Sequence, residues 1–224
     1  MNILLVAATE GEICPLLQHL QHDWRMAGGR LYQRGDHRLQ VLITGVGMVA
    51  TAYSLGKELS RRRYDLALQA GIAGSFDKGI PLGEVVFVAS EQFGDLGAED
   101  HDRHLDIFEM GLLQPDAAPF VKGRLDTPLT ERHRNIRLRQ VSGLTVNMVS
   151  GNERTIARLA ERYSCQIESM EGAAFHYVCL SEDVPAFAQI RSISNYVTPR
   201  DRASWKMREA VTALNDWLID FVKG

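Results

Sequence analysis

The chain has 224 residues, of which 45% are hydrophobic and 24% charged, a composition typical of a globular protein. A formal net charge of −3 gives no basic footprint, so nucleic acid is not an expected partner. The three cysteines form no CxxC pair, which favours a reducing, cytoplasmic setting. The N-terminus lacks the basic segment of a signal peptide, and no run reaches the roughly 18 apolar residues of a membrane span, so no membrane partner is expected.

Short apolar runs rich in Val and Ile alternate with helical patterns along the chain. The runs predict strands at Ile3–Ala8, Leu39–Thr44, Asp65–Ala70, Glu84–Ala89, Val141–Val149 and Ala186–Ser194. The patterns predict helices at Glu10–Leu20, Met48–Arg62, Asn152–Tyr163 (with Asn152 as a cap), Gly172–Ser181 and Ala203–Val222. Residues 95–130 are polar and weakly periodic, which indicates a long loop region with room for one short helix. The prediction is a single α/β domain over residues 1–224, with a mixed, mostly parallel central sheet between helices.

Three glycine-containing stretches follow predicted strands, where open α/β sheets place their sites. "ATEGE" sets Glu10 and Glu12 at the end of the first strand; acids suit a helix's first turn, and they also suit a general base beside a bound water. "TGVGMVA" fits the dinucleotide pattern G-x-G-x-x-A, but its position in the chain favours glycines that allow close helix–sheet packing. "QAGIAGSF" predicts a tight turn whose N–H groups could line a ligand.

Two further stretches place polar groups where the chain is otherwise apolar. In "ESMEGAAF", Glu171 stands at a strand-to-helix junction, where it could bind a vicinal diol or serve as a first-turn acid. In "QIRSISNYVTPRDRASW", a buried strand contains Arg191 and ends at Asn195, and the simple alternation of a strand predicts that both face the same side. The histidines of "GAEDHDRHLD" lack a metal-ligand spacing, which favours a solvated loop and no metal site.

The order of these motifs resembles the purine nucleoside phosphorylase and methylthioadenosine nucleosidase superfamily over nearly the whole chain. The shared order is an acid after the first strand, then "GIAG", "MEGAA" and "RSIS" followed by a polar residue. Within the superfamily, "SEQFGDLGAED", "ESMEGAAF" and "RSISNYVTPRDRASW" are most similar to the futalosine hydrolases, which act in an alternative menaquinone pathway. The resemblance implies a nucleoside phosphorylase-like three-layer sandwich, no cofactor, and a homodimer or higher homo-oligomer.

The resemblance also implies a role for individual residues. Glu12 would help activate the attacking water, Arg191 would lie near that water, and Asn195 would face the purine leaving group. Met170 and Glu171 would bind the ribose. The residues that would line the pocket are Ile72, Ala73, Gly74 and Asn152. The nucleosidases have a Phe shortly after their "SGD", whereas Glu153-Arg154-Thr155 follow here, which leaves Phe93 as a candidate for base stacking.

These roles predict hydrolysis of the N-ribosyl bond of futalosine, a purine nucleoside. An amide at position 195 donates to a 6-oxo purine, whereas the adenine-specific nucleosidases have an aspartate there. Arg202 and Trp205 are candidates for binding the anionic 5′ tail; a surface ion-pair cluster around Asp201 is the alternative. The alternatives for the whole chain are a methylthioadenosine, adenosylhomocysteine or 6-aminofutalosine nucleosidase, a purine nucleoside phosphorylase, and a non-catalytic nucleoside-binding domain.

Overall fold

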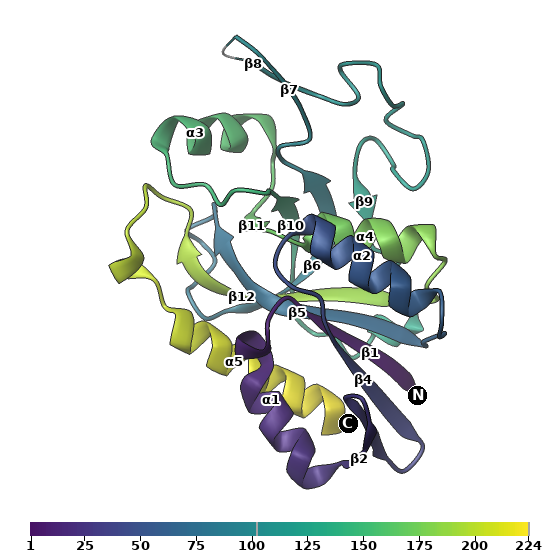
Figure 1. Cartoon of the computed structure of the whole chain (residues 1–224). Coiled ribbons are helices and arrows are strands. Elements are labelled where there is room, and N and C mark those ends of the chain that lie inside the picture. The colour runs from purple at the N-terminus through teal and green to yellow at the C-terminus, as the bar shows by residue number, and fades with distance from the viewer. Residues whose placement is uncertain (102, 224) are drawn as a thin grey trace.

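Four parallel strands form the centre of the sheet in the computed structural model, which describes residues 1–101 and 103–223 (Figure 1). They lie in the order β12-β5-β1-β4. Their bounds are β1 (Asn2–Ala7), β4 (His37–Ile43), β5 (Leu66–Ser75) and β12 (Phe187–Tyr196). Because they are parallel, their carboxyl ends meet at one edge, which is where the polar motifs follow.

Three more strands close part of the sheet into a ring. They are β6 (Val85–Phe93), β10 (Arg139–Thr145) and β11 (Ile167–Ser169). β6 pairs antiparallel with β12 and parallel with β10, and β10 pairs parallel with β11. β11 then pairs antiparallel with the end of β5, with Ile167 opposite Ser75. The mixed, mostly parallel central sheet expected from the sequence is therefore confirmed.

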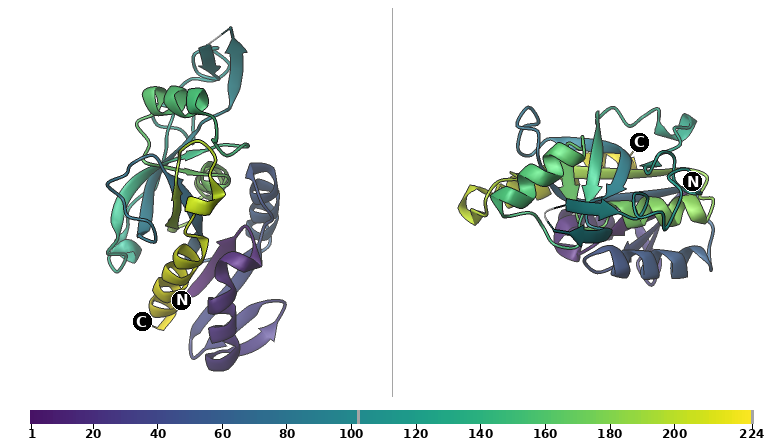
Figure 2. Two further views of the ribbon diagram at one scale, coloured as in Figure 1. Left: turned by 90° about the vertical axis from the view of Figure 1, so that its left-hand side faces the viewer. Right: turned by 90° about the horizontal axis from the view of Figure 1, so that it is seen from above.

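Helices cover both faces of this sheet, as Figures 1 and 2 show. Their bounds are α1 (Glu10–Asp23), α2 (Met48–Leu59), α3 (Glu153–Arg162), α4 (Gly172–Ser181) and α5 (Met207–Lys223). Leu5 of β1 lies in one core cluster with residues of α1 and α5, whereas its neighbour Leu4 lies in a second cluster with residues of α2 and α4. Successive side chains of a strand point to opposite faces, so two covered faces require the continuous apolar run seen in β1. Among the helices of the described residues, none is long and apolar enough to cross a bilayer.

Several short strands lie where the sequence predicted none. β2 (Arg25–Gly28) and β3 (Leu31–Arg34) extend the sheet beyond β4. β7 (Gly97–Asp100) and β8 (Arg103–Asp106) form a separate hairpin that projects from the body of the molecule (Figure 1). β9 (Leu125–Asp126) follows further along the same segment. The prediction of a short helix within residues 95–130 is therefore wrong for the residues that the structure describes there; Asp102 lies outside them.

Candidate active site

Glu12 stands in the first turn of α1, directly after the carboxyl end of β1. Its Oε2 accepts hydrogen bonds from the backbone N of Thr9 (3.0 Å) and from Thr9 Oγ1 (3.1 Å). Its Oε1 accepts from the backbone N of Ile72 on β5, at 3.2 Å. Glu10 is exposed and pairs with Arg30. Of the two acids in "ATEGE", Glu12 is therefore the one that reaches the neighbouring strand.

Gly71 allows Glu12 and Arg191 to approach each other. A Cβ at Gly71 would lie 2.5 Å from Arg191 Nη1 and 2.8 Å from Glu12 Oε1, so no larger residue fits without moving both side chains. Gly71 and Gly74 lie inside β5, which continues to Ser75. The tight turn predicted for "QAGIAGSF" is therefore wrong: the glycines serve close approach within a strand.

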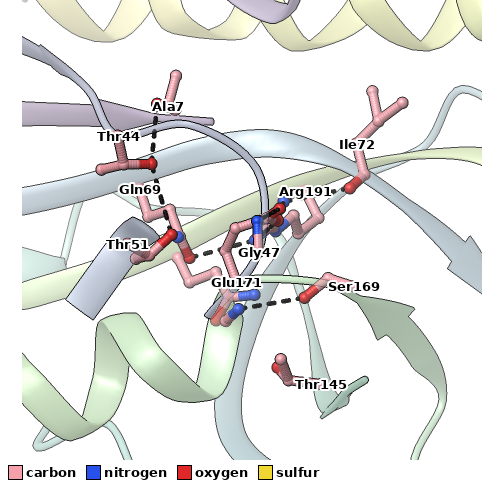
Figure 3. Close-up of polar contacts among 12 residues, drawn as sticks. Ala7, Thr44, Gly47, Thr51, Gln69, Ile72, Thr145, Ser169, Glu171 and Arg191 are labelled. Carbon is pink, nitrogen blue, oxygen red and sulfur yellow. Dashed lines mark hydrogen bonds and ion pairs between the residues drawn. The ribbon is translucent and has the colours of Figure 1, made fainter. Parts of the chain in front are cut away.

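Arg191 and Glu171 form a buried ion pair (Figure 3). Nη1 and Nη2 of Arg191 lie 3.4 and 3.3 Å from Glu171 Oε2. The guanidinium also donates to the Ile72 carbonyl oxygen (3.2 Å) and to Gln69 Oε1 (3.3 Å). Glu171 Oε1 accepts from the backbone N of Gly47 at 3.0 Å. Gly47 directly precedes α2 and has a φ of 92°, so this glycine of "TGVGMVA" provides a backbone conformation that favours glycine and an amide for Glu171.

Glu171 occupies the cap position of α4, but its side chain does not cap that helix. The first amides of α4 bond elsewhere, because Gly172 N donates to Ser169 Oγ (3.3 Å) and Ala173 N donates to Thr145 Oγ1 (2.7 Å). Ser169 and Thr145 lie beside the start of the helix in Figure 3. The Glu171 carboxylate is thereby directed toward Arg191 and Gly47.

Asn195 is the penultimate residue of β12, and its amide is held in a defined orientation. Oδ1 accepts from Ser194 Oγ at 2.8 Å, and Nδ2 donates to the Tyr196 carbonyl oxygen at 3.1 Å. Because a carbonyl oxygen can only accept a hydrogen bond, the side-chain nitrogen of Asn195 must face the Tyr196 carbonyl. The second N–H of this nitrogen does not bond to Tyr196. A Cβ at Gly74 would lie 3.1 Å from Nδ2, so Gly74 makes room for this amide.

β12 lacks the regular alternation from which Arg191 and Asn195 were expected to face the same side. Arg191 pairs with Gly71, whereas Asn195 pairs with Gly74, so four residues of β12 span three of β5. The extra residue forms a bulge between Ile193 and Asn195. The bulge, not a regular strand, therefore sets where Asn195 points.

The remaining predicted ribose and pocket residues lie close by. Ile72, Ala73 and Gly74 follow Gly71 on β5, and Gly74 pairs with Glu168 of β11. Met170 is partly buried between β11 and α4, next to Glu171. Strand pairing thus brings the "GIAG" and "MEGAA" motifs together.

Asn152, Arg202 and Trp205 lie on two adjoining loops. Asn152 is exposed, and its Oδ1 caps α3 by accepting from the backbone N of Arg154 at 3.0 Å. Arg202 is exposed on the short turn Arg202–Ser204, which Asp201 caps through the backbone N of Ala203. Arg200, not Arg202, lies over the Trp205 ring, with 5.5 Å between its Cζ and the ring centroid. Arg200 N also donates to the Gly151 carbonyl oxygen at 3.2 Å, which joins the two loops.

Phe93, the candidate for base stacking, ends β6 opposite Thr145. Its ring packs against Phe120, with 6.2 Å between centroids. It also lines a cavity of about 340 Å³ together with Phe108 and Tyr163. Its stacking role stays a prediction. Within residues 1–101 and 103–223, no group of three or more His, Cys, Asp or Glu side chains could hold a metal ion.

Sequence reasoning missed two residues next to the site, Gln69 and Glu91. Gln69 looks like an ordinary strand residue, yet its Oε1 accepts from Arg191. Glu91 is fully buried in β6, and burial raises the pKa of its carboxyl to about 7. The available signal was the interruption of an apolar strand by a carboxylate, at "VASEQF".

Comparison with known proteins identifies the family of the chain. The family model of the phosphorylase superfamily matches residues 2–223. Futalosine hydrolase of Thermus thermophilus is 36% identical over 174 residues, covering 77% of this chain and 76% of that protein. Futalosine hydrolase of Streptomyces coelicolor is 33% identical over 195 residues, covering 80% and 78%.

Among solved structures, the fold is similar to that of the 5′-methylthioadenosine/S-adenosylhomocysteine nucleosidase of Neisseria meningitidis in complex with methylthio-immucillin-A. The TM-score is 0.77 at 18% identity, covering 99% of this chain and 98% of that one. At this identity the likeness supports the fold alone. The match over residues 2–223 and the two relatives above 30% identity show that the chain belongs to the phosphorylase superfamily, in the nucleosidase branch that includes the futalosine hydrolases.

Proposed function

We propose that this chain hydrolyses the N-ribosyl bond of futalosine, releasing hypoxanthine and dehypoxanthine futalosine for menaquinone biosynthesis. The observation that carries the proposal is the convergence of Glu12, Arg191 and Glu171 around Gly71 at the carboxyl edge of the sheet. This arrangement combines the partly exposed carboxylate of Glu12 with the buried carboxylate of Glu171, which is held by Arg191. The identity of 33–36% to futalosine hydrolases supports the choice of substrate.

Each carboxylate has a separate task in this reaction. Glu171 accepts hydrogen bonds from the ribose hydroxyls, which holds C1′ in place. Water attacks C1′ and gives a proton to Glu12, while the bond between C1′ and N9 breaks and its electron pair leaves with the purine. Positive charge develops on the ribose in the transition state, and the carboxylates of Glu12 and Glu171 stabilise it. The hydrogen bond from Ile72 N holds Glu12 in position for this step.

Asn195 supports a 6-oxo purine as the leaving group. The free N–H of its Nδ2 donates to an oxygen at the purine 6-position, whereas an adenine presents a donor there. A mismatched group in a dry pocket costs about 1–3 kcal/mol. An amide cannot protonate N7, so the departing base takes its proton from water.

Water, not phosphate, is the proposed nucleophile. A phosphate dianion binds where free backbone amides and cations converge. After β1, the backbone N and the hydroxyl of Thr9 are already bonded to the Glu12 carboxylate. A phosphate near this carboxylate would meet a like charge.

We also propose that the protein forms a homo-oligomer through α2. Val49 and Tyr53, exposed by 82% and 68%, lie four residues apart and form an exposed stripe of the helix, and Val46, which precedes the helix, is exposed by 56%. The opposite side of α2 packs against the core through Leu55 and Leu59. A second copy of the chain would cover the exposed stripe. Light scattering of the wild type and of Val49→Asp tests this: a monomeric wild type would contradict it.

The decisive experiment incubates the protein with futalosine, inosine, 6-aminofutalosine and methylthioadenosine, with and without phosphate. We expect free hypoxanthine from futalosine, at a rate that does not depend on phosphate. Faster release of adenine from a 6-amino substrate would identify an adenine-type nucleosidase. Formation of ribose 1-phosphate products would identify a phosphorylase, and release of no base from any nucleoside would contradict catalysis.

A further inference from the structure

Glu91 is a buried carboxylate that the proposed mechanism does not use. It lies in β6, and its residue is 0% exposed. Its Oε1 accepts from Gln189 Nε2, and its Oε2 accepts from Thr145 Oγ1, both at 2.9 Å. Both donors are neutral groups, so the carboxylate has hydrogen bonds but no direct contact with a cation. Burying a carboxylate in this way is energetically unfavourable.

Two glycines make room for this carboxylate. A Cβ at Gly143 of β10, or at Gly172 at the start of α4, would overlap Glu91 Oε1. The two glycines lie on different elements and meet the same oxygen atom. The chain is therefore shaped around a carboxylate in contact with the first turn of α4.

The Thr145 hydroxyl connects Glu91 to α4. Thr145 Oγ1 donates its single proton to Glu91 Oε2, so its lone pairs are free to accept from Ala173 N at 2.7 Å. The first four amides of a helix have no partner within the helix, and Ala173 N is one of them. Without Thr145, the side chain in position to accept from this amide would be that of Glu171, which occupies the cap position.

We propose that Glu91 is a positioning residue: it orients Thr145 to cap α4, which releases the Glu171 carboxylate from capping and leaves it available to the ribose. The ribose part of this inference rests on the proposed function, whereas the capping part does not. Glu91 acts through Thr145 and Glu171 and touches no reacting atom. A loss of orientation should therefore weaken ribose-dependent binding and leave recognition of the base intact.

The kinetic test compares Thr145→Val, Thr145→Ser and Glu91→Gln with the wild type on inosine, 2′-deoxyinosine and futalosine. We expect Thr145→Val to raise KM for both ribonucleosides about tenfold, to raise KM for the 2′-deoxynucleoside much less, and to leave inhibition by free hypoxanthine unchanged. Thr145→Ser, which keeps the hydroxyl, should restore the wild-type KM. Glu91→Gln should raise KM less than Thr145→Val does, because its amide keeps one acceptor oxygen in place of the two of the carboxylate.

The control is Thr127→Val, which removes another buried hydroxyl, one that bonds the Val88 carbonyl oxygen at 3.5 Å. It should leave KM for every substrate unchanged. Equal losses on the ribonucleosides and the 2′-deoxynucleoside in Thr145→Val, or no loss at all, would overturn the inference.

Hydrogen exchange separates this inference from the proposed function. In Thr145→Val, the amide of Ala173 should exchange faster, whether or not the protein hydrolyses any nucleoside. Unchanged exchange at Ala173 would overturn the inference even if the wild type is a nucleosidase. A wild type that is inactive on all nucleosides, with faster exchange in the variant, would contradict the proposed function and keep the capping role.

Discussion

Arg191 Nη2 lies 3.3 Å from Glu171 Oε2, and both side chains are almost completely buried, at 2% and 7% exposure. The pair joins β12 to the start of α4. One end of the Glu171 carboxylate faces this cation and the other faces the amide of Gly47. Two donors therefore hold the carboxylate in place, while its remaining lone pairs can accept from a ligand.

Removal of the cation should destabilise the fold. Arg191→Met leaves the Glu171 charge buried without its partner, which costs about 3–5 kcal/mol of unfolding free energy. Urea denaturation measures this loss. The double variant Arg191→Met/Glu171→Gln should recover part of it, because no buried charge of the pair remains. A double variant no more stable than Arg191→Met would show that the ion pair is not the cause.

A methyl group at Gly71 should abolish activity. In Gly71→Ala the new Cβ would push Arg191 Nη1 and Glu12 Oε1 apart, so we expect kcat to fall at least a hundredfold, an effect of about 2.7 kcal/mol or more. The matched control is Gly56→Ala, in the middle of α2, where a Cβ meets no atom within 4 Å. That variant should keep full activity and gain about 0.5–1 kcal/mol in stability. Wild-type kcat in Gly71→Ala would remove this pair from the mechanism.

Asn195→Asp should shift the substrate preference toward 6-amino purines. The replaced Nδ2 lies 3.1 Å from the Tyr196 carbonyl oxygen, so the new carboxyl group must keep a proton on that side or turn away. Either result removes the donor to a 6-oxo group, and a penalty of about 1–3 kcal/mol changes the ratio of kcat/KM about five- to 150-fold. The measurement is the ratio of kcat/KM for futalosine and 6-aminofutalosine. An unchanged ratio would mean that Asn195 does not contact the base.

The pH dependence of stability should reveal two buried groups with opposite effects. Burial raises the pKa of Glu91 to about 7, so the native state binds more protons than the unfolded state and loses stability as pH rises from about 4.5 to 7. Burial lowers the pKa of His176 to about 4, so stability is gained as pH rises from about 4 to 6.5. Between about pH 4.5 and 6.5, the two contributions offset each other.

Glu91→Gln removes one of these contributions. The free energy of unfolding of Glu91→Gln, relative to that of the wild type, should increase by about 2 kcal/mol from pH 5 to pH 8, since one pKa unit corresponds to about 1.36 kcal/mol. Urea denaturation at the two pH values measures the difference. A stability difference that stays constant from pH 5 to pH 8 would show that Glu91 does not titrate in this range.

Arg202→Ala should raise KM for futalosine and leave KM for inosine unchanged, because inosine lacks the anionic 5′ tail. We expect a rise of three- to tenfold, corresponding to about 0.7–1.4 kcal/mol for an exposed charge. Arg208→Ala, at another exposed arginine near the start of α5, is the control and should change neither value. An unchanged KM for futalosine would remove Arg202 from the tail site; Arg200, which lies over Trp205, would then be the next arginine to substitute.

The long apolar strands and their flanking helices could be predicted because both faces of the sheet are covered. β1 is apolar from Ile3 to Ala7, β12 is buried along its length up to Asn195, and α4 has the predicted bounds, Gly172–Ser181. The short strands gave no such signal. All four residues of β2 are exposed, and β11 has only three residues, so neither shows a period. In β5, Gly71 and Gly74 favour a turn by local chemistry, and the pairing with β12 and β11 keeps this segment extended.

The positions of candidate site residues could be predicted where they come shortly after a strand, as for Glu12 and Glu171. They could not be predicted where the position depends on a contact across the sheet. Gln69 and Glu91 lie within strands, and their partners are far along the chain, with Arg191 on β12 for Gln69 and Thr145 on β10 for Glu91. The bulge before Asn195 has the same cause, since no residue of "RSISN" marks the position where the register changes.

The pairing of Ile167 with Ser75 has a consequence for the order of folding. β11 is three residues long and must pair with β10 and with β5, whose segments lie far apart in the chain. Contacts of such long range form late, because the loop entropy is lost before the contact is gained. Glu171 follows β11 by two residues, so its carboxylate reaches Arg191 only once this strand has joined both neighbours. Enzymatic activity should therefore return after most of the secondary structure during refolding, because the site around Glu171 needs these long-range pairings.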